Sequence, residues 1–304
     1  MFDKIISVTP NPSLDVALWI DSRELEVTHE VLNERVDAGG KAINVSRALN
    51  SLGQESKALG FAGKRNVGTL ESLLNDDKTP CAFKVVSGKI RENIIVNVEG
   101  ENPLKVNRKG FSVTKEDINE LLDMIKAEVV PNTLVHFGGS LPDGFSVSDY
   151  IEMINEVSKI AKVSVDTAKL TIDDYKKMKL YLIKPNLEET AALLGHDING
   201  ADEAIKAAKE LLPYVENVMI SLGGDGMLLV NENGEHTVKA AKVEMKSTVG
   251  AGDTSIAGFL YAKQQGMDDE NALKFAAACG SASVQLEGTQ AITLDEAKKV
   301  LGLM

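Results

Sequence analysis

The sequence Thr248-Val249-Gly250-Ala251-Gly252-Asp253 runs directly into the apolar helical pattern of residues 254–260. Glycines let other groups approach the backbone closely, because they have no Cβ atom. The first amides of a helix have no partner inside it and lie at the positive end of its dipole. The stretch therefore predicts an anion site with the Asp253 carboxylate beside it, an arrangement suited to phosphoryl transfer. The alternative is a glycine turn in which Asp253 only stabilises the helix start.

Length and charge narrow the choice of fold and partner. A chain of 304 residues fits one large domain, with or without a small appendage. It carries 33 Lys and Arg against 45 Asp and Glu, a formal net charge of −12. Because that charge repels nucleic acid and anionic membranes, we expect neither as a partner. A phosphate-bearing ligand then needs a local basic cluster.

Cysteine usage and hydropathy indicate the compartment. Cys81 and Cys279 lie far apart in the sequence and predict no disulfide framework. The first residues form too short an apolar run for a signal peptide, and no later run is long enough to span a bilayer. We therefore expect a soluble cytoplasmic protein.

From about residue 130 onward, short apolar runs alternate with amphipathic helical patterns. This alternation predicts the α/β class, with a mostly parallel sheet covered by helices on both faces. The expected strands are residues 134–137, 163–166, 182–184 and 218–222. The expected helices are residues 148–160, 187–194, 204–212, 252–264, 271–286 and 294–301.

The first third of the chain has a different pattern. Short strands are expected at residues 16–20, 31–36, 83–86 and 93–98, and a helix over residues 42–52 ends at Gly53. We interpret the strands as a small sheet built by two excursions, about residues 12–37 and 82–108, from a single domain of residues 1–304. A small sheet over a nucleotide-binding fold would serve as a lid.

Several common phosphate, metal and nucleophile motifs are missing. The chain has no G-x-x-x-x-G-K-[ST] loop and no G-x-G-x-x-G after a strand. Its four histidines lack the spacing of a zinc pair, and there is no G-x-S-x-G elbow. Together these absences favour phosphate chemistry of a different construction.

Two stretches in the first fifty residues can contact a polar ligand. Gly39 and Gly40 open a helix in which Asn44 lies one turn further on, and Lys41 adds a positive charge. The alternative is an ordinary helix start with a solvated lysine. Asn11 and Asp15 follow the first strand, where the loops of a parallel sheet line the ligand crevice. Both can hydrogen-bond a polyol, although Asn11 in an Asx turn explains it equally well.

Two later stretches also leave strands. The first is Lys184-Pro185-Asn186-Leu187-Glu188-Glu189, in which Asn186 and Glu189 have the spacing of a capping box. The functional alternative places Glu189 near a magnesium ion, through water. Ser221-Leu222-Gly223-Gly224-Asp225-Gly226 can let a nucleotide lie against bare backbone. The alternative for this second stretch is a tight hairpin turn into residues 227–230.

Taken in order, residues 39–47 and 248–253 resemble the PfkB-type carbohydrate kinases of the ribokinase-like family, over essentially the whole chain. The resemblance implies an α/β domain with a β-sheet lid, ATP as phosphoryl donor and Mg²⁺ as helper. It implies that Asp253 is the catalytic base and that the amides of Gly250, Ala251 and Gly252 form the anion hole. At a helix start, we expect a low pKa for Asp253.

The same resemblance assigns the remaining contacts. Asn186 and Glu189 match the family's magnesium-linked motif, which implies that they bind the ion through water. The expected nucleotide contacts are Lys184, Asn186, Ser221, Gly223 and Gly226. The expected sugar contacts are Asp15, Gly39, Gly40 and Asn44, joined by Asn11 and Lys41.

The form T-x-N-P-x-x-D at residues 9–15, together with Lys41, resembles the hexose-phosphate branch of the family. That branch includes 1-phosphofructokinase, which converts fructose 1-phosphate to fructose 1,6-bisphosphate, and tagatose-6-phosphate kinase, which converts tagatose 6-phosphate to tagatose 1,6-bisphosphate. The expected phosphate clamp is Arg91, Lys105 and Arg108 on the lid, and Ser140 matches a substrate-contacting serine.

Two departures, one alternative function and one expectation of assembly accompany this resemblance. Relatives often have glycine where Ala42 stands and threonine where Ile90 stands, which bears on the sugar that fits. A sugar-phosphate sensor without turnover is the non-enzyme alternative, but a sensor has no need of Asp253. An edge of the lid sheet can pair with a second copy, so a homodimer through the lid is a further expectation.

Overall fold

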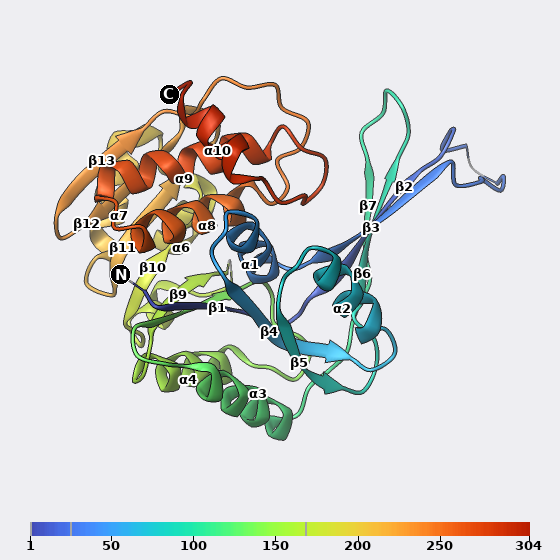
Figure 1. The fold of residues 1–304 in the computed structure, drawn as a ribbon, viewed down its shortest axis with the longest axis horizontal. Helices are drawn as coiled ribbons and strands as arrows, with labels where there is room; N and C mark the ends of the chain where they lie inside the picture. Colours follow the sequence, from blue (N-terminus) through green and yellow to red (C-terminus); the bar gives the residue numbers. More distant parts are fainter. Residues whose placement is uncertain (1, 25, 168) are drawn as a thin grey trace.

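Two sheets of unequal size organise the chain (Figure 1). The computed structural model describes residues 2–24, 26–167 and 169–304. Leu25, inside the predicted excursion 12–37, lies outside the described residues. Within the described part, nine strands form the large sheet and four form a small sheet that projects from it.

The large sheet is mostly parallel and has the order β13-β12-β11-β10-β9-β8-β1-β4-β5. Only the hairpin strands β12 and β13 run antiparallel to their neighbours. The strands are β1 (Lys4–Thr9), β4 (Ser56–Gly63), β5 (Cys81–Val86), β8 (Thr133–Gly138), β9 (Lys162–Asp166), β10 (Leu180–Ile183), β11 (Val215–Ser221), β12 (Met227–Asn231) and β13 (Gly234–Val238). Strands β8 and β10 are buried along their whole length, as expected when helices cover both faces of a parallel sheet.

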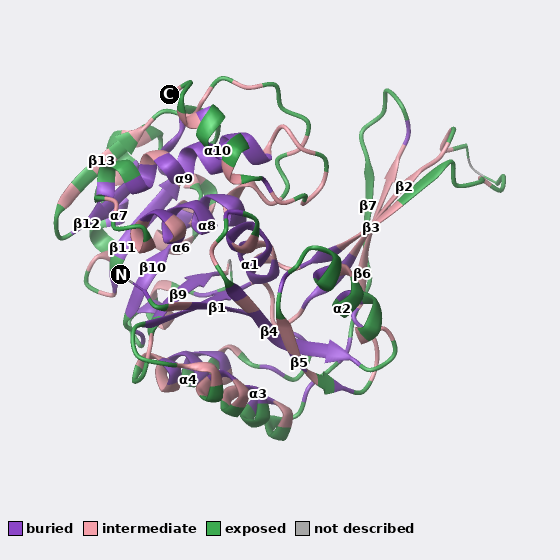
Figure 2. Ribbon diagram, in the orientation of Figure 1, coloured by how far each residue is buried: buried purple, intermediate pink, exposed green. Residues whose placement is uncertain are grey.

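Helices pack on both faces of this sheet, and their inward-facing residues are buried (Figure 2). One face carries α1 (Lys41–Ser51), α8 (Ala251–Gln264), α9 (Asp269–Ser283) and α10 (Leu294–Leu301). The other face carries α3 (Lys115–Glu128), α4 (Val147–Ser158), α5 (Ile172–Tyr175), α6 (Leu187–Leu194) and α7 (Gly200–Leu211). Helix α2 (Val67–Asp76) lies on the α1 side, where Arg47 of α1 pairs with Asp77 at the end of α2 over 2.6 Å (Figure 1). The predicted α/β class, with a mostly parallel sheet flanked by helices and a small separate sheet, is confirmed.

The small sheet has the order β3-β2-β6-β7. Its strands are β2 (Ser13–Trp19), β3 (Asn33–Gly39), β6 (Arg91–Asn97) and β7 (Leu104–Asn107). The prediction that residues 83–86 belong to it is wrong, because β5 pairs in parallel with β4 in the large sheet. Helix α2 makes the crossover between these two strands, which places β5 beside β4.

Alternation along the strands gives the small sheet two different faces. Asp15 lies opposite Asp37 on β3 and Asn93 on β6, so these polar residues share one face. Val16 lies opposite Val36 and Ile94 on the other face, which is mainly apolar.

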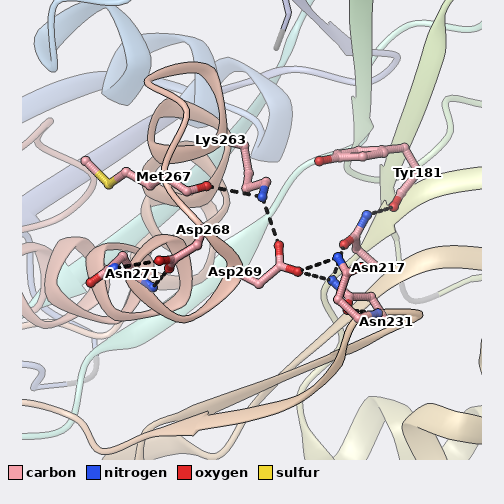
Figure 3. A network of polar contacts seen from close by, with 9 residues as sticks. Tyr181, Asn217, Asn231, Lys263, Met267, Asp268, Asp269 and Asn271 are labelled. Carbon is pink, nitrogen blue, oxygen red and sulfur yellow. Dashed lines mark hydrogen bonds and ion pairs between the residues drawn. The ribbon is translucent and has the colours of Figure 1, made fainter.

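A polar network fixes the far end of α8 (Figure 3). Lys263 of α8 donates to Asp269 of α9 over 2.8 Å, and Asn231 of β12 donates to the same carboxylate over 2.9 Å. Asn231 also donates to Asn217, which in turn donates to the Tyr181 carbonyl over 3.0 Å. These groups satisfy one another, so the network holds α8 and α9 against the sheet and thereby orients the N-terminus of α8.

No helix within the described residues is both long and apolar enough to cross a bilayer.

Candidate active site

The predicted site segments meet at one edge of the large sheet, the edge formed by the carboxyl ends of its parallel strands, because each segment follows such a strand. The loop with Asn11 leaves β1, Ser140 follows β8, and Lys184 follows β10. Ser221 is the last residue of β11. Helices α1 and α8 both begin at this edge, so amides, lysines and carboxylates from distant parts of the chain share one region.

The N-terminus of α8 forms the centre of this region. Gly250 is its N-cap residue and has φ of 80°, a left-handed conformation that favours glycine. The Ala251 amide has a long hydrogen bond of 3.4 Å to the Thr248 carbonyl. Among the described residues, none accepts a hydrogen bond from the amides of Gly252 or Asp253. An anion can therefore bind at this helix end.

The Asp253 carboxylate is held beside these amides. It is 7% exposed, and Asn44 of α1 donates to its Oδ2 atom over 2.8 Å. Burial raises the pKa of Asp253 to about 7, and the nearby Asp166 charge adds to the increase, while Asn44, Lys41 and Lys184 oppose it. The expectation of a low pKa is wrong, because loss of solvation outweighs the favourable helix end. A carboxylate with this pKa is a better base than an ordinary aspartate at neutral pH.

Two lysines lie beside Asp253. Lys41 donates to Asp166 over 2.9 Å, and a Cβ atom on Gly252 would lie 3.0 Å from the Lys184 ammonium nitrogen. Burial opposes the charge of Lys41, but attraction to Asp166, Asp253 and Glu189 raises its pKa overall. Lys41 was expected at the sugar, whereas here its ammonium group lies among these carboxylates.

Asp15 lies across the region, on the small sheet. Ser13 and Asn93 each donate to its Oδ1 atom over 2.8 Å. A Cβ atom on Gly39 would lie 2.5 Å from Asp15 Oδ2, so only glycine lets the carboxylate approach the backbone here. Gly40, the next residue, is the N-cap of α1. Burial raises the pKa of Asp15, although the hydrogen bonds from Ser13 and Asn93 and the charge of Arg91 act against this.

Asn11 connects the β1 and β8 loops. Its Nδ2 atom donates to Ser140 Oγ over 3.1 Å, which brings together two of the predicted sugar contacts. The Oδ1 atoms of Asn11 and Asn44 are buried, and neither has a hydrogen-bond partner among the described residues. Buried polar atoms usually have a partner, so each of these oxygens is available to a ligand hydroxyl.

The predicted phosphate clamp divides between the two faces of the small sheet. Arg91 is half-buried and lies on the polar face of β6, in phase with Asn93. Its Nη1 atom donates to Asn93 over 3.3 Å, and its Nε atom donates to the Asn11 carbonyl over 3.4 Å. Lys105 lines a cleft of about 470 Å³ between this face and residues 245–249 and 287–289. Arg108 is exposed and forms an ion pair with Glu92 instead. Its inclusion in the clamp is wrong for this arrangement, because Glu92 alternates with Arg91 and lies on the opposite face.

A second cavity, of about 370 Å³, opens beside the α8 N-terminus. Four of the predicted nucleotide contacts line it: Asn186, Ser221, Gly223 and Gly226. Ala251 and Gly252 complete the end nearest the anion site, and Met227, Ala241 and Val243 supply apolar surface. A largely apolar pocket that ends at unpaired amides fits a nucleotide base followed by its phosphates.

Asn186 and Glu189 form the capping box of α6. The Asn186 side chain accepts from the Glu189 amide over 2.7 Å, and Glu189 Oε2 accepts from the Asn186 amide over 3.0 Å. Within the described ranges, no cluster of three His, Cys, Asp or Glu could hold a metal on its own. Magnesium commonly takes one or two protein carboxylates and completes its shell with phosphate and water. Glu189 fits that use, since only its Oε2 atom is engaged in the capping box.

Three groups near the site escaped the sequence interpretation. Asp166 is the last residue of β9, so the rule that ligands bind at the carboxyl ends of parallel strands could have identified it. Asn93 lies inside a strand of the small sheet and carries no motif. His136 is buried, its Nδ1 atom bonds Ser164 over 2.8 Å, and burial lowers its pKa to about 4.

Comparison with known proteins agrees with this geometry. The model of the pfkB family carbohydrate kinases matches residues 12–297. The 1-phosphofructokinase of Haloferax volcanii is 33% identical over 96% of this chain and 94% of its own length. Phosphofructokinase-2 from Escherichia coli, solved in complex with substrates and products, has a TM-score of 0.91 at 27% identity and 98% coverage of both chains. A tetrameric inhibited form of that enzyme has a TM-score of 0.89 at 26% identity, again with 98% coverage of both chains. The chain belongs to the pfkB family of carbohydrate kinases.

Proposed function

We propose that the protein transfers the γ-phosphoryl group of ATP to a hydroxyl of a ketohexose monophosphate. Fructose 1-phosphate, giving fructose 1,6-bisphosphate, is the preferred acceptor. The observation that carries this proposal is the Asn44–Asp253 hydrogen bond, which holds a buried carboxylate beside two unpaired amides. A similar relative, that of Haloferax volcanii, is a 1-phosphofructokinase, which supports the choice of acceptor.

In this mechanism Asp253 accepts the proton of the attacking hydroxyl while the new phosphorus–oxygen bond forms and ADP leaves. Asn44 orients the carboxylate through its amide nitrogen. The amides of Gly252 and Asp253 donate to the oxygens on which negative charge develops. Because the transition state is loose, this positioning and charge stabilisation contribute more than activation of the nucleophile.

The acceptor would lie between Asp15 and Asp253. Asp15 accepts hydrogen bonds from sugar hydroxyls through Oδ2, since its Oδ1 atom is already occupied. The unpartnered Oδ1 atoms of Asn11 and Asn44 accept further hydroxyls. Arg91 and Lys105, on the polar face of the small sheet, would bind the acceptor phosphate. Tagatose 6-phosphate has the same groups, so tagatose-6-phosphate kinase is the alternative activity.

A magnesium ion would be held by Glu189, directly or through water, with Asn186 fixing that side chain. When bound, the ion neutralises phosphate charge and aligns the donor. Lys184 and the cavity lined by Ser221, Gly223 and Gly226 would bind the donor nucleotide.

The small sheet would act as the lid. Arg35 of β3 pairs with Asp37 over 2.9 Å and with Glu287 of the large domain over 3.4 Å. The contact between Arg35 and Glu287 would break or form as the small sheet moved against the large domain. Closure would exclude water from the transferring group and so limit ATP hydrolysis.

A homodimer through the apolar face of the small sheet is also proposed. On β7, Leu104 and Val106 are 47% and 45% exposed, and the register places Val106 beside Ile94. A tetrameric form of the Escherichia coli relative supports assembly.

Light scattering should give twice the mass of one chain, and Val106→Lys should give a single-chain mass, because a charge cannot be buried there unpaired. A monomeric wild type would contradict the proposal.

A coupled ADP-release assay tests the activity. We expect MgATP-dependent turnover with fructose 1-phosphate at the highest kcat/KM among fructose 1-phosphate, fructose 6-phosphate and tagatose 6-phosphate. Analysis of the product identifies the hydroxyl that is phosphorylated. Binding of a sugar phosphate without ADP release would instead indicate a sensor. A preference for tagatose 6-phosphate would select the alternative kinase.

A further inference from the structure

Asp166 has no role in the mechanism above, although it lies within the site. It is 5% exposed and ends β9, between the β8 and β10 strand ends. A buried carboxylate is costly unless it is paired, so its partners indicate why it is there. Lys41 of α1 donates to its Oδ1 atom over 2.9 Å.

A second lysine approaches from the other side. Lys184 follows β10, which neighbours β9, and its ammonium nitrogen lies against the Gly252 backbone. Attraction to Lys184 and Lys41 lowers the pKa of Asp166 in spite of its burial, which is the largest opposing effect. Asp166 is thus the ion-pair partner of Lys41, and its charge also attracts Lys184 on the neighbouring strand end.

We propose that Asp166 is a positioning residue that holds Lys41 and Lys184 at the transferring phosphoryl group and keeps Lys41 from pairing with Asp253. This inference rests on the proposed phosphoryl transfer. It also reassigns Lys41, which contacts the reacting phosphoryl group and not the phosphate that the acceptor already carries.

The geometry supports this reassignment. The Lys41 ammonium group donates to Asp166 over 2.9 Å, and the charges of Asp253 in the first turn of α8 and of Glu189 also attract it. The acceptor-phosphate side of the region belongs to the small sheet, where Arg91 and Lys105 lie. Without the Asp166 charge, the other carboxylates that attract Lys41 are the base itself and Glu189. An ion pair with Lys41 would make Asp253 a weaker base.

The test compares Asp166→Asn, Lys41→Met and the double variant. Asp166→Asn keeps the shape of the side chain and removes its charge. We expect kcat to fall about 30- to 1,000-fold in each single variant, with the KM for the sugar phosphate changed less than about threefold. The double variant should be no slower than the slower single variant, because both changes remove the same arrangement.

A pH profile supplies a second readout. A purely structural role of Asp166 would not produce both a shifted profile and the non-additive loss of kcat in the double variant. Asp166 raises the pKa of Asp253, while Lys41, Lys184 and Asn44 lower it. Asp166→Asn should therefore move the acidic limb of kcat/KM to lower pH. In the Lys41→Met background the same substitution should move it less, because Lys41 can no longer reach the base.

Asp173→Asn is the matched control. Asp173 pairs with Lys176 over 2.8 Å, a similar distance, but at the exposed surface. This variant should keep the wild-type kcat and pH profile.

Three results would overturn the inference: additive losses in the double variant, nearly full kcat in Asp166→Asn, or a raised KM for the sugar phosphate with unchanged kcat in Lys41→Met. If Asp166→Asn does not fold, Lys41→Met decides the question: a lowered kcat with an unchanged KM for the sugar phosphate supports the inference, and the reverse overturns it. Wild-type protein without turnover overturns the proposed function and this inference together. Wild-type turnover with an unaffected Asp166→Asn variant overturns this inference alone.

Discussion

Asp253→Asn should lower kcat by about 10²- to 10⁴-fold, the usual contribution of a general base, and leave the KM for ATP nearly unchanged. The amide retains the size of the carboxylate but cannot accept the hydroxyl proton. Its neighbours Asn44 and Gly252 keep their positions, so donor binding at the α8 amides should persist. Initial rates with saturating ATP and fructose 1-phosphate give kcat, and titration of each substrate gives its KM.

The acidic limb of the wild-type pH profile belongs to the same prediction. Asp253 must be deprotonated to act as a base, and its pKa is raised to about 7, chiefly by burial. The kcat/KM should therefore fall as the pH drops below about 7 and level off above it. Exposed Asp202, in the first turn of α7, offers the control Asp202→Asn, which should change neither rate nor profile. An Asp253→Asn variant with most of its turnover would remove Asp253 from the role of base.

The buried part of the fold could be predicted because apolar runs and helical periods agree with the final structure there. Strands β8 and β9 and helix α6 lie where the sequence pattern indicated. Sheet membership could not be read in the same way. Residues 83–86 have the alternation of a small-sheet strand, and only the α2 crossover determines that they extend the large sheet. Strand β7 has only four residues, so the alternation of Leu104 and Val106 with polar residues was too short to identify it as a strand.

Within the site, local motifs at strand ends identified the functional residues. Contacts between residues far apart in the sequence could not be predicted. The Asn44–Asp253 contact joins residues that two separate motifs had identified. Arg108 was misplaced because the face of a strand residue depends on register, and the pairing of Asn93 with Asn107 turns Arg108 toward Glu92. The pKa of Asp253 was misjudged because burial is a property of the assembled site. That the small sheet closes as a lid stays a proposal.

Arg91→Ala should raise the KM for the sugar phosphate about 10- to 100-fold while the KM for ATP changes less than about twofold. A guanidinium has five N–H donors, and the recorded bonds of Arg91 are long, at 3.3 Å and 3.4 Å. Burial lowers the pKa of Arg91, and the Asp15 charge opposes this only in part. A phosphate dianion beside Arg91 would therefore gain a partly desolvated partner that has unused N–H donors.

Arg108→Ala is the matched control, because it removes the same charge from the opposite face of the same sheet. It should leave the KM for the sugar phosphate within about twofold of the wild type, since an exposed ion pair contributes little. Unphosphorylated fructose separates the two contributions of Arg91: with no phosphate to bind, its weak kcat/KM should be equal in wild type and Arg91→Ala. If fructose and fructose 1-phosphate lose the same factor, Arg91 supports the sheet and does not bind phosphate. If Arg108→Ala matches Arg91→Ala, the net charge of the sheet attracts the acceptor and no specific clamp exists.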